Sequence, residues 1–141
     1  MSTNSPFTQI PAELQAVFEE LRQFEPIFHT AEFGSTAEDF EDRMSPEYWE
    51  VGASGRRYSR AFILQEAGKI AHIDASHAGW QISEYGLRQF DPGIFLLTYT
   101  LNQNGRLTRR ASIWQKHEGS WQILYHQGTI VTSDEDDTLP A

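Results

Sequence analysis

Residues 93–131 are GIFLLTYTLNQNGRLTRRASIWQKHEGSWQILYHQGTIV, and this stretch decides the fold. Asn104-Gly105 is a strong signal for a two-residue hairpin turn, because Asn and Gly both tolerate positive φ. Glu118-Gly119 marks a second turn between two further apolar runs. The prediction is a meander of three antiparallel strands, at residues 94–101, 107–116 and 121–131.

Polar residues interrupt these otherwise apolar strands. Arg110, Ser112 and His126 stand among aromatic residues that include Tyr99 and Trp114. Burying a polar side chain costs free energy unless it finds a partner. Arg supplies a fixed fork of donors, and His can donate, accept or carry a proton near neutral pH. We therefore predict a pocket for a carboxylate, carbonyl or phenol; the alternative is that Arg110 reaches solvent and His126 is structural.

The first turn fixes the register of the first hairpin. A two-residue turn at Asn104-Gly105 pairs Tyr99 with Arg110 and Leu97 with Ser112. Residues that lie directly opposite each other project to the same face of the sheet. These four side chains are therefore predicted to share one face.

The second turn decides where His126 points. Glu118 is costly in the left-handed region, which favours a three-residue loop at 117–119 with only Gly119 left-handed. That loop pairs Arg110 with His126. A two-residue turn, or a bulge in the strand, would instead move His126 to the opposite face.

This register assigns two faces to the meander. The predicted pocket face carries Phe95, Leu97, Tyr99, Arg110, Ser112, Trp114, Leu124 and His126. The predicted outer face carries Thr98, Thr100, Ala111, Ile113, Trp121, Ile123, Tyr125 and Gln127.

The chain before the meander has helical periodicity. An apolar stripe of Leu14, Val17, Phe18, Leu21 and Phe24 predicts a helix from Pro11 to Glu25, which Pro26 ends. The further predicted elements are a short helix capped by Ser35 or Thr36 and ending near Met44, a strand at 48–51, a turn at 52–55, a helix capped by Ser59, and a strand at 80–85. Helices followed by an antiparallel meander indicate an α+β domain.

Composition bounds the function. The 141 residues include no cysteine, which excludes disulfides, thiol catalysis and thiolate metal sites. The net charge of −9 argues against nucleic-acid binding. No apolar stretch is long enough to span a membrane and no signal peptide is evident, so the expected location is the cytoplasm. No histidine pair has metal-ligand spacing and no phosphate-loop motif occurs, so neither metal nor cofactor is predicted.

The predicted organisation is one domain at 11–131, between a flexible N-terminus at 1–10 and an acidic, disordered tail at 132–141. Three further residues are candidates for the pocket. Glu50 is expected to face it, with Trp49 and Val51 on the other side, as a general base or as the partner of an arginine. Tyr58 is a rim residue or a core residue, and His29 closes the pocket or lies on the surface.

Three segments carry a family resemblance: YWEVGASGR at 48–56, RASIW at 110–114 and YHQGT at 125–129. They resemble the nuclear transport factor 2-like superfamily, and within it an uncharacterised, mostly bacterial branch of SnoaL-like proteins, over about residues 12–131. The resemblance implies a cone-shaped half-barrel, in which a curved antiparallel sheet wraps around N-terminal helices. It also implies a homodimer formed through the outer sheet face, here with Ile113, Trp121, Ile123 and Tyr125.

Three functions are consistent with these residues. The first is a small-molecule-binding domain that holds its ligand with Tyr58, Tyr99, Arg110, Ser112, Trp114 and His29. The second is a cofactor-free lyase, isomerase or hydrolase, with His126 or Glu50 as the catalytic acid–base group. The third is a protein-interaction module that acts through the outer sheet face.

Overall fold

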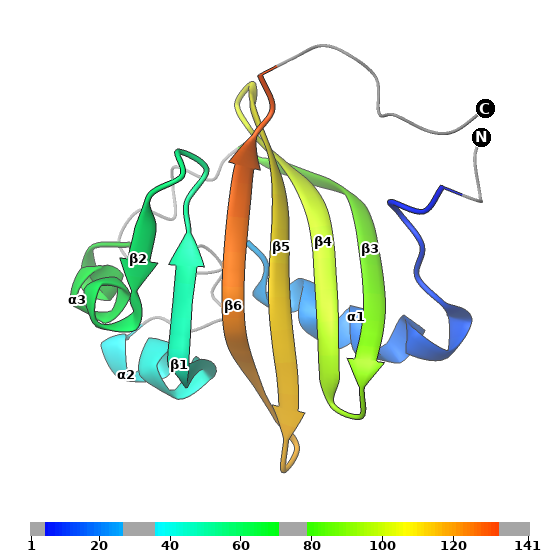
Figure 1. Ribbon diagram of the computed structural model, residues 1–141, viewed down its shortest axis with the longest axis horizontal. Coiled ribbons are helices and arrows are strands. Elements are labelled where there is room, and N and C mark those ends of the chain that lie inside the picture. Colours follow the sequence, from blue (N-terminus) through cyan, green and yellow to red (C-terminus); the bar gives the residue numbers. More distant parts are fainter. Residues whose placement is uncertain (1–4, 27–35, 71–78, 133–141) are drawn as a thin grey trace.

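One curved, unclosed sheet of six strands and an N-terminal helix form an α+β fold, as predicted (Figure 1). The computed structural model describes residues 5–26, 36–70 and 79–132. Its elements, with η for a 3₁₀ helix, are η1 (Ala12–Leu14), α1 (Gln15–Leu21), η2 (Arg22–Phe24), α2 (Ala37–Arg43), β1 (Met44–Val51), β2 (Arg57–Ser59), α3 (Arg60–Ile70), β3 (Gln81–Asp91), β4 (Ile94–Gln103), β5 (Arg106–His117) and β6 (Ser120–Ile130). The strand order is β2-β1-β6-β5-β4-β3, and only β1 and β6 are parallel.

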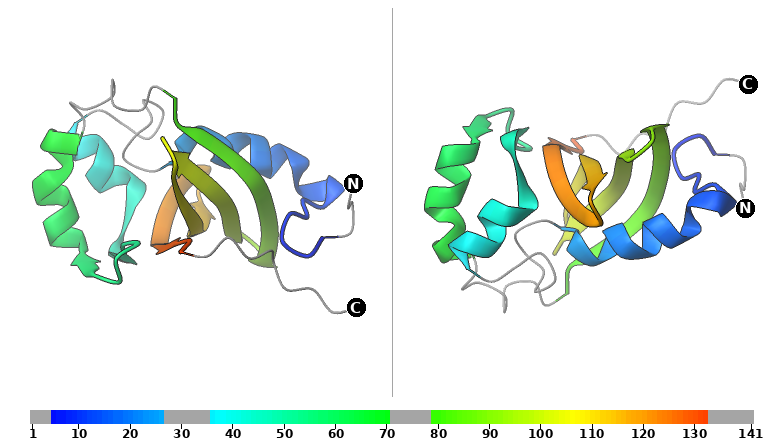
Figure 2. Two further views of the ribbon diagram at one scale, coloured as in Figure 1. Left: turned by 90° about the horizontal axis from the view of Figure 1, so that it is seen from above. Right: turned by 90° about the horizontal axis from the view of Figure 1, so that it is seen from below.

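The N-terminal helical segment lies across one side of the curved sheet, which we call the inner face (Figure 2). Leu14, Phe18 and Leu21 are buried there, which confirms the apolar stripe expected from the sequence. Packing of this stripe stabilises a helix of only seven residues, which would be marginal in isolation. Among the described residues, no helix is long and apolar enough to cross a membrane.

Two predicted helix starts are confirmed. Thr36 accepts a hydrogen bond from the Asp39 backbone, and the Asp39 carboxylate accepts one from the Thr36 backbone, so both cap α2. Ser59 accepts a hydrogen bond from the backbone of Phe62 at the start of α3. These caps set the ends of the two helices that pack beside β1.

The first hairpin has the predicted register, and the second does not. Tyr99 pairs with Arg110 across a turn in which Asn104 has a φ of 58°. At the second turn Glu118 has a φ of 51°, so the loop has two residues and His117 pairs with Ser120. The prediction that Glu118 avoids the left-handed region was therefore wrong.

A bulge in β6 returns His126 to the face that was predicted for it. Ile113 pairs with Tyr125 while Trp114 pairs with Ile123, so Leu124 is an extra residue in the strand. Beyond the bulge, Ser112 pairs with His126 and Arg110 pairs with Gly128, not with His126 as predicted. His126 still projects to the inner face, because the extra residue reverses the alternation once more.

The residues between the turn and the bulge lie on the other face from that predicted. Trp121 and Ile123 are 5% and 0% exposed and belong to the core, so their assignment to the outer face was wrong. Trp121 packs edge-on against Phe95, with ring centroids 5.4 Å apart.

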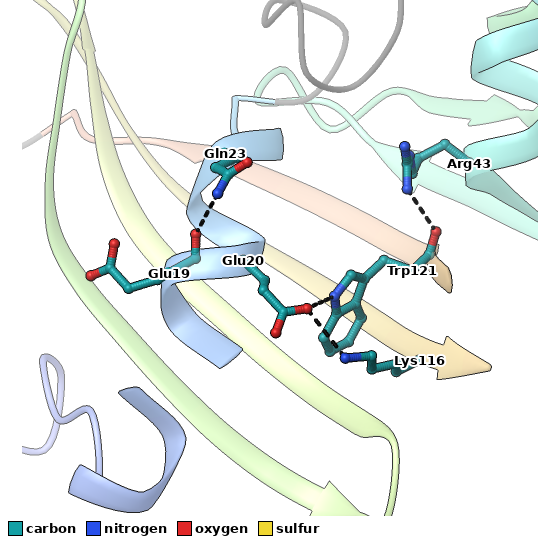
Figure 3. A network of polar contacts seen from close by, with 6 residues as sticks. All are labelled: Glu19, Glu20, Gln23, Arg43, Lys116 and Trp121. Atoms are coloured by element: carbon teal, nitrogen blue, oxygen red, sulfur yellow. Dashed lines mark hydrogen bonds and ion pairs between the residues drawn. The ribbon is translucent and has the colours of Figure 1, made fainter. Parts of the chain in front are cut away.

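A polar network attaches α1 and α2 to this second hairpin (Figure 3). The Glu20 carboxylate on α1 accepts hydrogen bonds from Trp121 Nε1 at 2.8 Å and Lys116 Nζ at 3.2 Å. On α2, the Arg43 guanidinium donates to the carbonyl of Trp121 at 3.4 Å. Trp121 is therefore linked to both helices, through its indole to α1 and through its backbone carbonyl to α2.

Candidate functional site

A buried carboxylate lies at the end of the N-terminal helical segment. Glu25 is 2% exposed and accepts hydrogen bonds from the Tyr99 hydroxyl at 2.6 Å and from Trp114 Nε1 at 3.2 Å. The two donors come from neighbouring strands, β4 and β5, and each binds a different oxygen of the carboxylate. The contact therefore links the helical segment directly to the centre of the inner face.

The imidazole of His126 is held from both sides. Its Nδ1 lies 2.7 Å from the Ser112 hydroxyl, and its Nε2 lies 3.4 Å from the Arg110 guanidinium. A guanidinium only donates, so a hydrogen bond from Arg110 requires Nε2 to be unprotonated. The proton would then be on Nδ1 and point to Ser112. Ser112 is completely buried and holds the ring at Nδ1.

Glu50 stands beside His126 on the inner face. The two residues are register partners in the parallel pair β1 and β6, and the Tyr48 hydroxyl donates to Glu50 at 2.5 Å. Trp49 is 45% exposed and packs against Tyr125 on the outer side, as the predicted alternation requires. We call the eight inner residues the inner polar cluster: Glu25, Tyr48, Glu50, Tyr99, Arg110, Ser112, Trp114 and His126.

A glycine makes room for the Arg110 side chain. A Cβ atom at Gly128 would lie 2.8 Å from Arg110 Nη1, closer than real Cβ atoms approach, and 3.0 Å from Cζ, which is unusually tight. Arg110 Nε also donates to the Thr108 hydroxyl at 2.9 Å. Gly128 and Thr108 therefore fix the guanidinium beside His126.

Burial sets the charge states of the cluster. It raises the pKa of Tyr99 well above its ordinary range, and the negative charge of Glu25 raises it further. Burial and the neighbouring Glu50 do the same to the pKa of Tyr48, so both phenols stay protonated and act as donors. Burial lowers the pKa of Arg110, but a guanidinium titrates so far above neutrality that it remains charged.

Solved structures share this fold at low sequence identity. A protein of unknown function from Pectobacterium atrosepticum is 14% identical over 86% of this chain and 94% of its own, with a TM-score of 0.64. An NTF2-like (nuclear transport factor 2-like) protein from Cytophaga hutchinsonii is 9% identical over 86% of this chain and 100% of its own, with a TM-score of 0.59. The chain has the NTF2-like fold.

A protein with a cystatin-like fold from Caulobacter vibrioides is also similar, at 19% identity over 84% of this chain and 89% of its own, with a TM-score of 0.57. No protein-family model matches the sequence, and no curated protein matches it. The comparisons therefore show the fold, and membership of the SnoaL-like branch stays a prediction.

The NTF2-like fold brings most of the predicted site residues together. Tyr99, Arg110, Ser112, Trp114, His126 and Glu50 all belong to the inner polar cluster. Tyr58 is half-buried opposite Glu50 in the register and stacks on Phe62, with ring centroids 5.3 Å apart. His29 lies outside the described residues. No group of three or more potential metal ligands occurs in the described ranges 5–26, 36–70 and 79–132.

Sequence reasoning missed Glu25 and Tyr48. Glu25 lies seven residues after Phe18 and four after Leu21, so it continues the buried stripe of the helix. The signal that could have identified Glu25 is therefore a carboxylate on an otherwise apolar helical stripe. Tyr48 is two residues before Glu50 in the same strand, and period-two alternation places both on one face.

The pH dependence of stability tests the burial of Glu50. Burial raises the pKa of Glu50 above its ordinary 4.5, against the hydrogen bond from Tyr48 and the charge of Arg110, which lower it. The folded state then holds the proton more tightly than the unfolded state. The stability contributed by Glu50 is therefore lost as pH rises from 4.5 through the folded pKa. In urea unfolding, the stability of the wild type relative to Glu50→Gln should fall as pH rises through this window.

For Glu84 the pH dependence of stability has the opposite sign, so Glu84→Gln serves as the control. A hydrogen bond from Thr100 lowers the pKa of Glu84, and the hydrogen bond and charge of Arg109 lower it further. The stability of the wild type relative to Glu84→Gln should therefore be present above the ordinary pKa and be lost as pH falls through the folded value. If stability relative to wild type changed with pH in the same direction for both variants, the assignment of Glu50 to the buried cluster would be contradicted.

Proposed function

We propose that the chain binds a small, partly polar organic molecule against the inner polar cluster of its NTF2-like fold. The observation that carries this proposal is the concentration of polar side chains at one place on the inner face. Glu25, Ser112 and His126 are at most 2% exposed, where apolar side chains would pack at lower cost. Buried titratable groups with shifted pKa values gather at functional sites.

The chemistry of the cluster suggests the ligand. Arg110 offers a planar fork of donors that matches a carboxylate or a carbonyl oxygen. His126 and Glu50, its register partner, add an imidazole and a carboxylate that can bind a hydroxyl. Tyr58, which is half-buried, provides aromatic surface. A small ring that carries a carboxylate, ketone or phenol group fits these donors best.

A binding screen tests this function. Wild type is heated with a panel of small aromatic and alicyclic carboxylates, ketones and phenols, and compounds that raise the melting temperature are titrated by calorimetry. We expect Arg110→Met and His126→Ala each to weaken a bound compound about tenfold, because each removes a buried polar contact. The control is Arg57→Met on β2, where the arginine is exposed; it should bind as wild type does. Failure of every compound to bind, or equal affinity in Arg110→Met, would overturn the proposal.

A second candidate function is acid–base catalysis on the bound molecule. The favouring observation is that Glu50 and His126 are adjacent on the inner face, with the Ser112 hydroxyl orienting the imidazole. A carboxylate of raised pKa beside an imidazole suits proton transfer near neutrality. Chemical change of a bound compound, followed by NMR, should then occur in wild type and stop in Glu50→Gln. Unchanged turnover in Glu50→Gln would exclude this role.

The homodimer is proposed on a smaller set of residues than the sequence suggested. Trp121 and Ile123 are in the core, so they cannot contribute to an outer interface. Trp49 and Tyr125 form an edge-to-face pair on the outer side, with ring centroids 5.0 Å apart. Together with Ile113 they are the residues through which two sheets would meet.

A further inference from the structure

The outer face of the sheet carries a hollow of about 630 Å³, which we call the outer hollow. Its floor includes Leu96, Thr98 and Ala111 on the neighbouring strands β4 and β5. Tyr99 and Arg110 border it too, but their polar atoms are engaged on the inner face with Glu25 and His126. The outer hollow therefore lies across the sheet from the inner polar cluster.

The N-terminal segment forms one wall of the outer hollow. Pro6, Phe7 and Thr8 line it, and the carbonyl of Gln9 accepts a hydrogen bond from the backbone of Leu87 on β3 at 2.9 Å. The segment approaches β3 closely because Gly86 has no side chain. A Cβ atom there would lie 2.8 Å from the carbonyl oxygen of Phe7. These contacts hold Phe7 beside the hollow.

Arg109 is held in one orientation in the outer hollow. Its Nη1 donates to the Glu84 carboxylate and to the Thr100 hydroxyl, both at 2.6 Å, and Thr100 itself donates to Glu84 at 2.7 Å. Glu84 lies at a bulge in β3 with a φ of 58°. A bulge re-aims a side chain, and a non-glycine residue at positive φ costs free energy. Glu84 is therefore a strained residue of β3, and its side chain reaches Arg109.

Arg88 gives the outer hollow a second guanidinium. No described residue forms an ion pair with Arg88, and its guanidinium lies 5.7 Å from the ring centroid of Phe90. The two arginines outweigh the one carboxylate of Glu84, so the hollow has an excess of positive charge on a chain of net charge −9. Gln127 and Thr129 add uncharged polar groups at the β6 side.

We propose that the outer hollow binds a small organic anion, an aromatic carboxylate or sulfonate, with the anionic group at Arg88 and Arg109. Guanidinium forks match such groups, and the apolar floor with Phe7 provides a surface for the ring. The volume lies within the range of small-molecule sites. This site is separate from the proposed function, because its residues face the other side of the sheet.

Two fluorescent probes test the proposal on the full chain. 1-Anilinonaphthalene-8-sulfonate carries an anionic group, and N-phenyl-1-naphthylamine is nearly the same molecule without it. Wild type should bind the sulfonate more tightly than the neutral amine. Arg88→Gln and Arg109→Gln should each weaken the sulfonate about fivefold, as expected for partly exposed charged contacts, and leave the amine unchanged.

Two more variants complete the experiment. Arg57→Gln removes an exposed arginine far from the hollow and should not change the affinity for the sulfonate. Gly86→Ala should weaken both probes, because the added Cβ atom displaces the wall at Phe7. The proposal is overturned if the sulfonate binds no better than the amine. It is also overturned if Arg88→Gln and Arg109→Gln bind the sulfonate as wild type does, or if Arg57→Gln weakens it equally.

Discussion

Replacing Glu25 by Leu should lower the free energy of unfolding by about 3 kcal/mol. The substitution removes the shared acceptor of Tyr99 and Trp114, so two donors in the interior lose a partner. Tyr99 and Trp114 are 3% and 0% exposed, so water cannot replace the carboxylate without opening the core. Urea unfolding followed by tryptophan fluorescence measures the change.

Glu20→Leu is the matched control for this experiment. Glu20 also accepts from a tryptophan Nε1, that of Trp121, and from Lys116, but its side chain is 46% exposed. Solvent can satisfy the donors there, so the expected loss is about 1 kcal/mol or less. A loss for Glu25→Leu no larger than that for Glu20→Leu would show that Glu25 is not a buried acceptor.

The second large effect is expected for Gly128→Val. The added side chain must displace the Arg110 guanidinium from its hydrogen bonds with Thr108 and His126, so we expect a loss of about 2 kcal/mol. Any compound bound through Arg110 should also be lost. Thr129→Val, the neighbouring exposed position of β6, should change stability by less than about 0.5 kcal/mol.

A double-mutant cycle assigns the effect of Gly128→Val to Arg110. In an Arg110→Ala background the space beside Gly128 is empty, so Gly128→Val should cost at least about 1 kcal/mol less than in wild type. An equal cost in both backgrounds would mean that the valine disturbs the strand itself and not the position of the Arg110 guanidinium.

The fold and one hairpin could be predicted because their signals are local. Asn104-Gly105 prefers positive φ through its own side chains, so the turn type and the whole register of β4 and β5 follow from two residues. Capping of α2 by Thr36 and of α3 by Ser59 is equally local. In each case the residues that make the structure are within three positions of one another.

The second hairpin could not be predicted in the same way. The penalty for Glu118 at positive φ is real but small, and burial of Trp121 and Ile123 against the helices outweighs it. The extra residue expected in the turn lies instead at Leu124. His126 therefore reached the predicted face through a different register, because either location of the extra residue reverses the alternation once.

Glu25 was missed for a different reason. The sequence places Glu25 on the apolar stripe of the helix. However, a single charged residue just before a proline is also typical of a helix end that is exposed to solvent. Only the approach of β4 and β5 supplies the Tyr99 hydroxyl and Trp114 Nε1, which lie 74 and 89 residues further along the chain. Contacts over such separations leave no trace in a local pattern.

The bulge at Leu124 also determines which changes of length this protein can tolerate. If Leu124 were deleted, Ile123 and Tyr125 would become neighbours and the strand would alternate regularly, with the cross-strand partners on both sides unchanged. Loss of another single residue, such as Trp121, would also remove the bulge, but Gln122 would then take the buried position of Trp121. Relatives that keep the same interior should therefore show a one-residue gap opposite Leu124, and their sheets should bend less at that point.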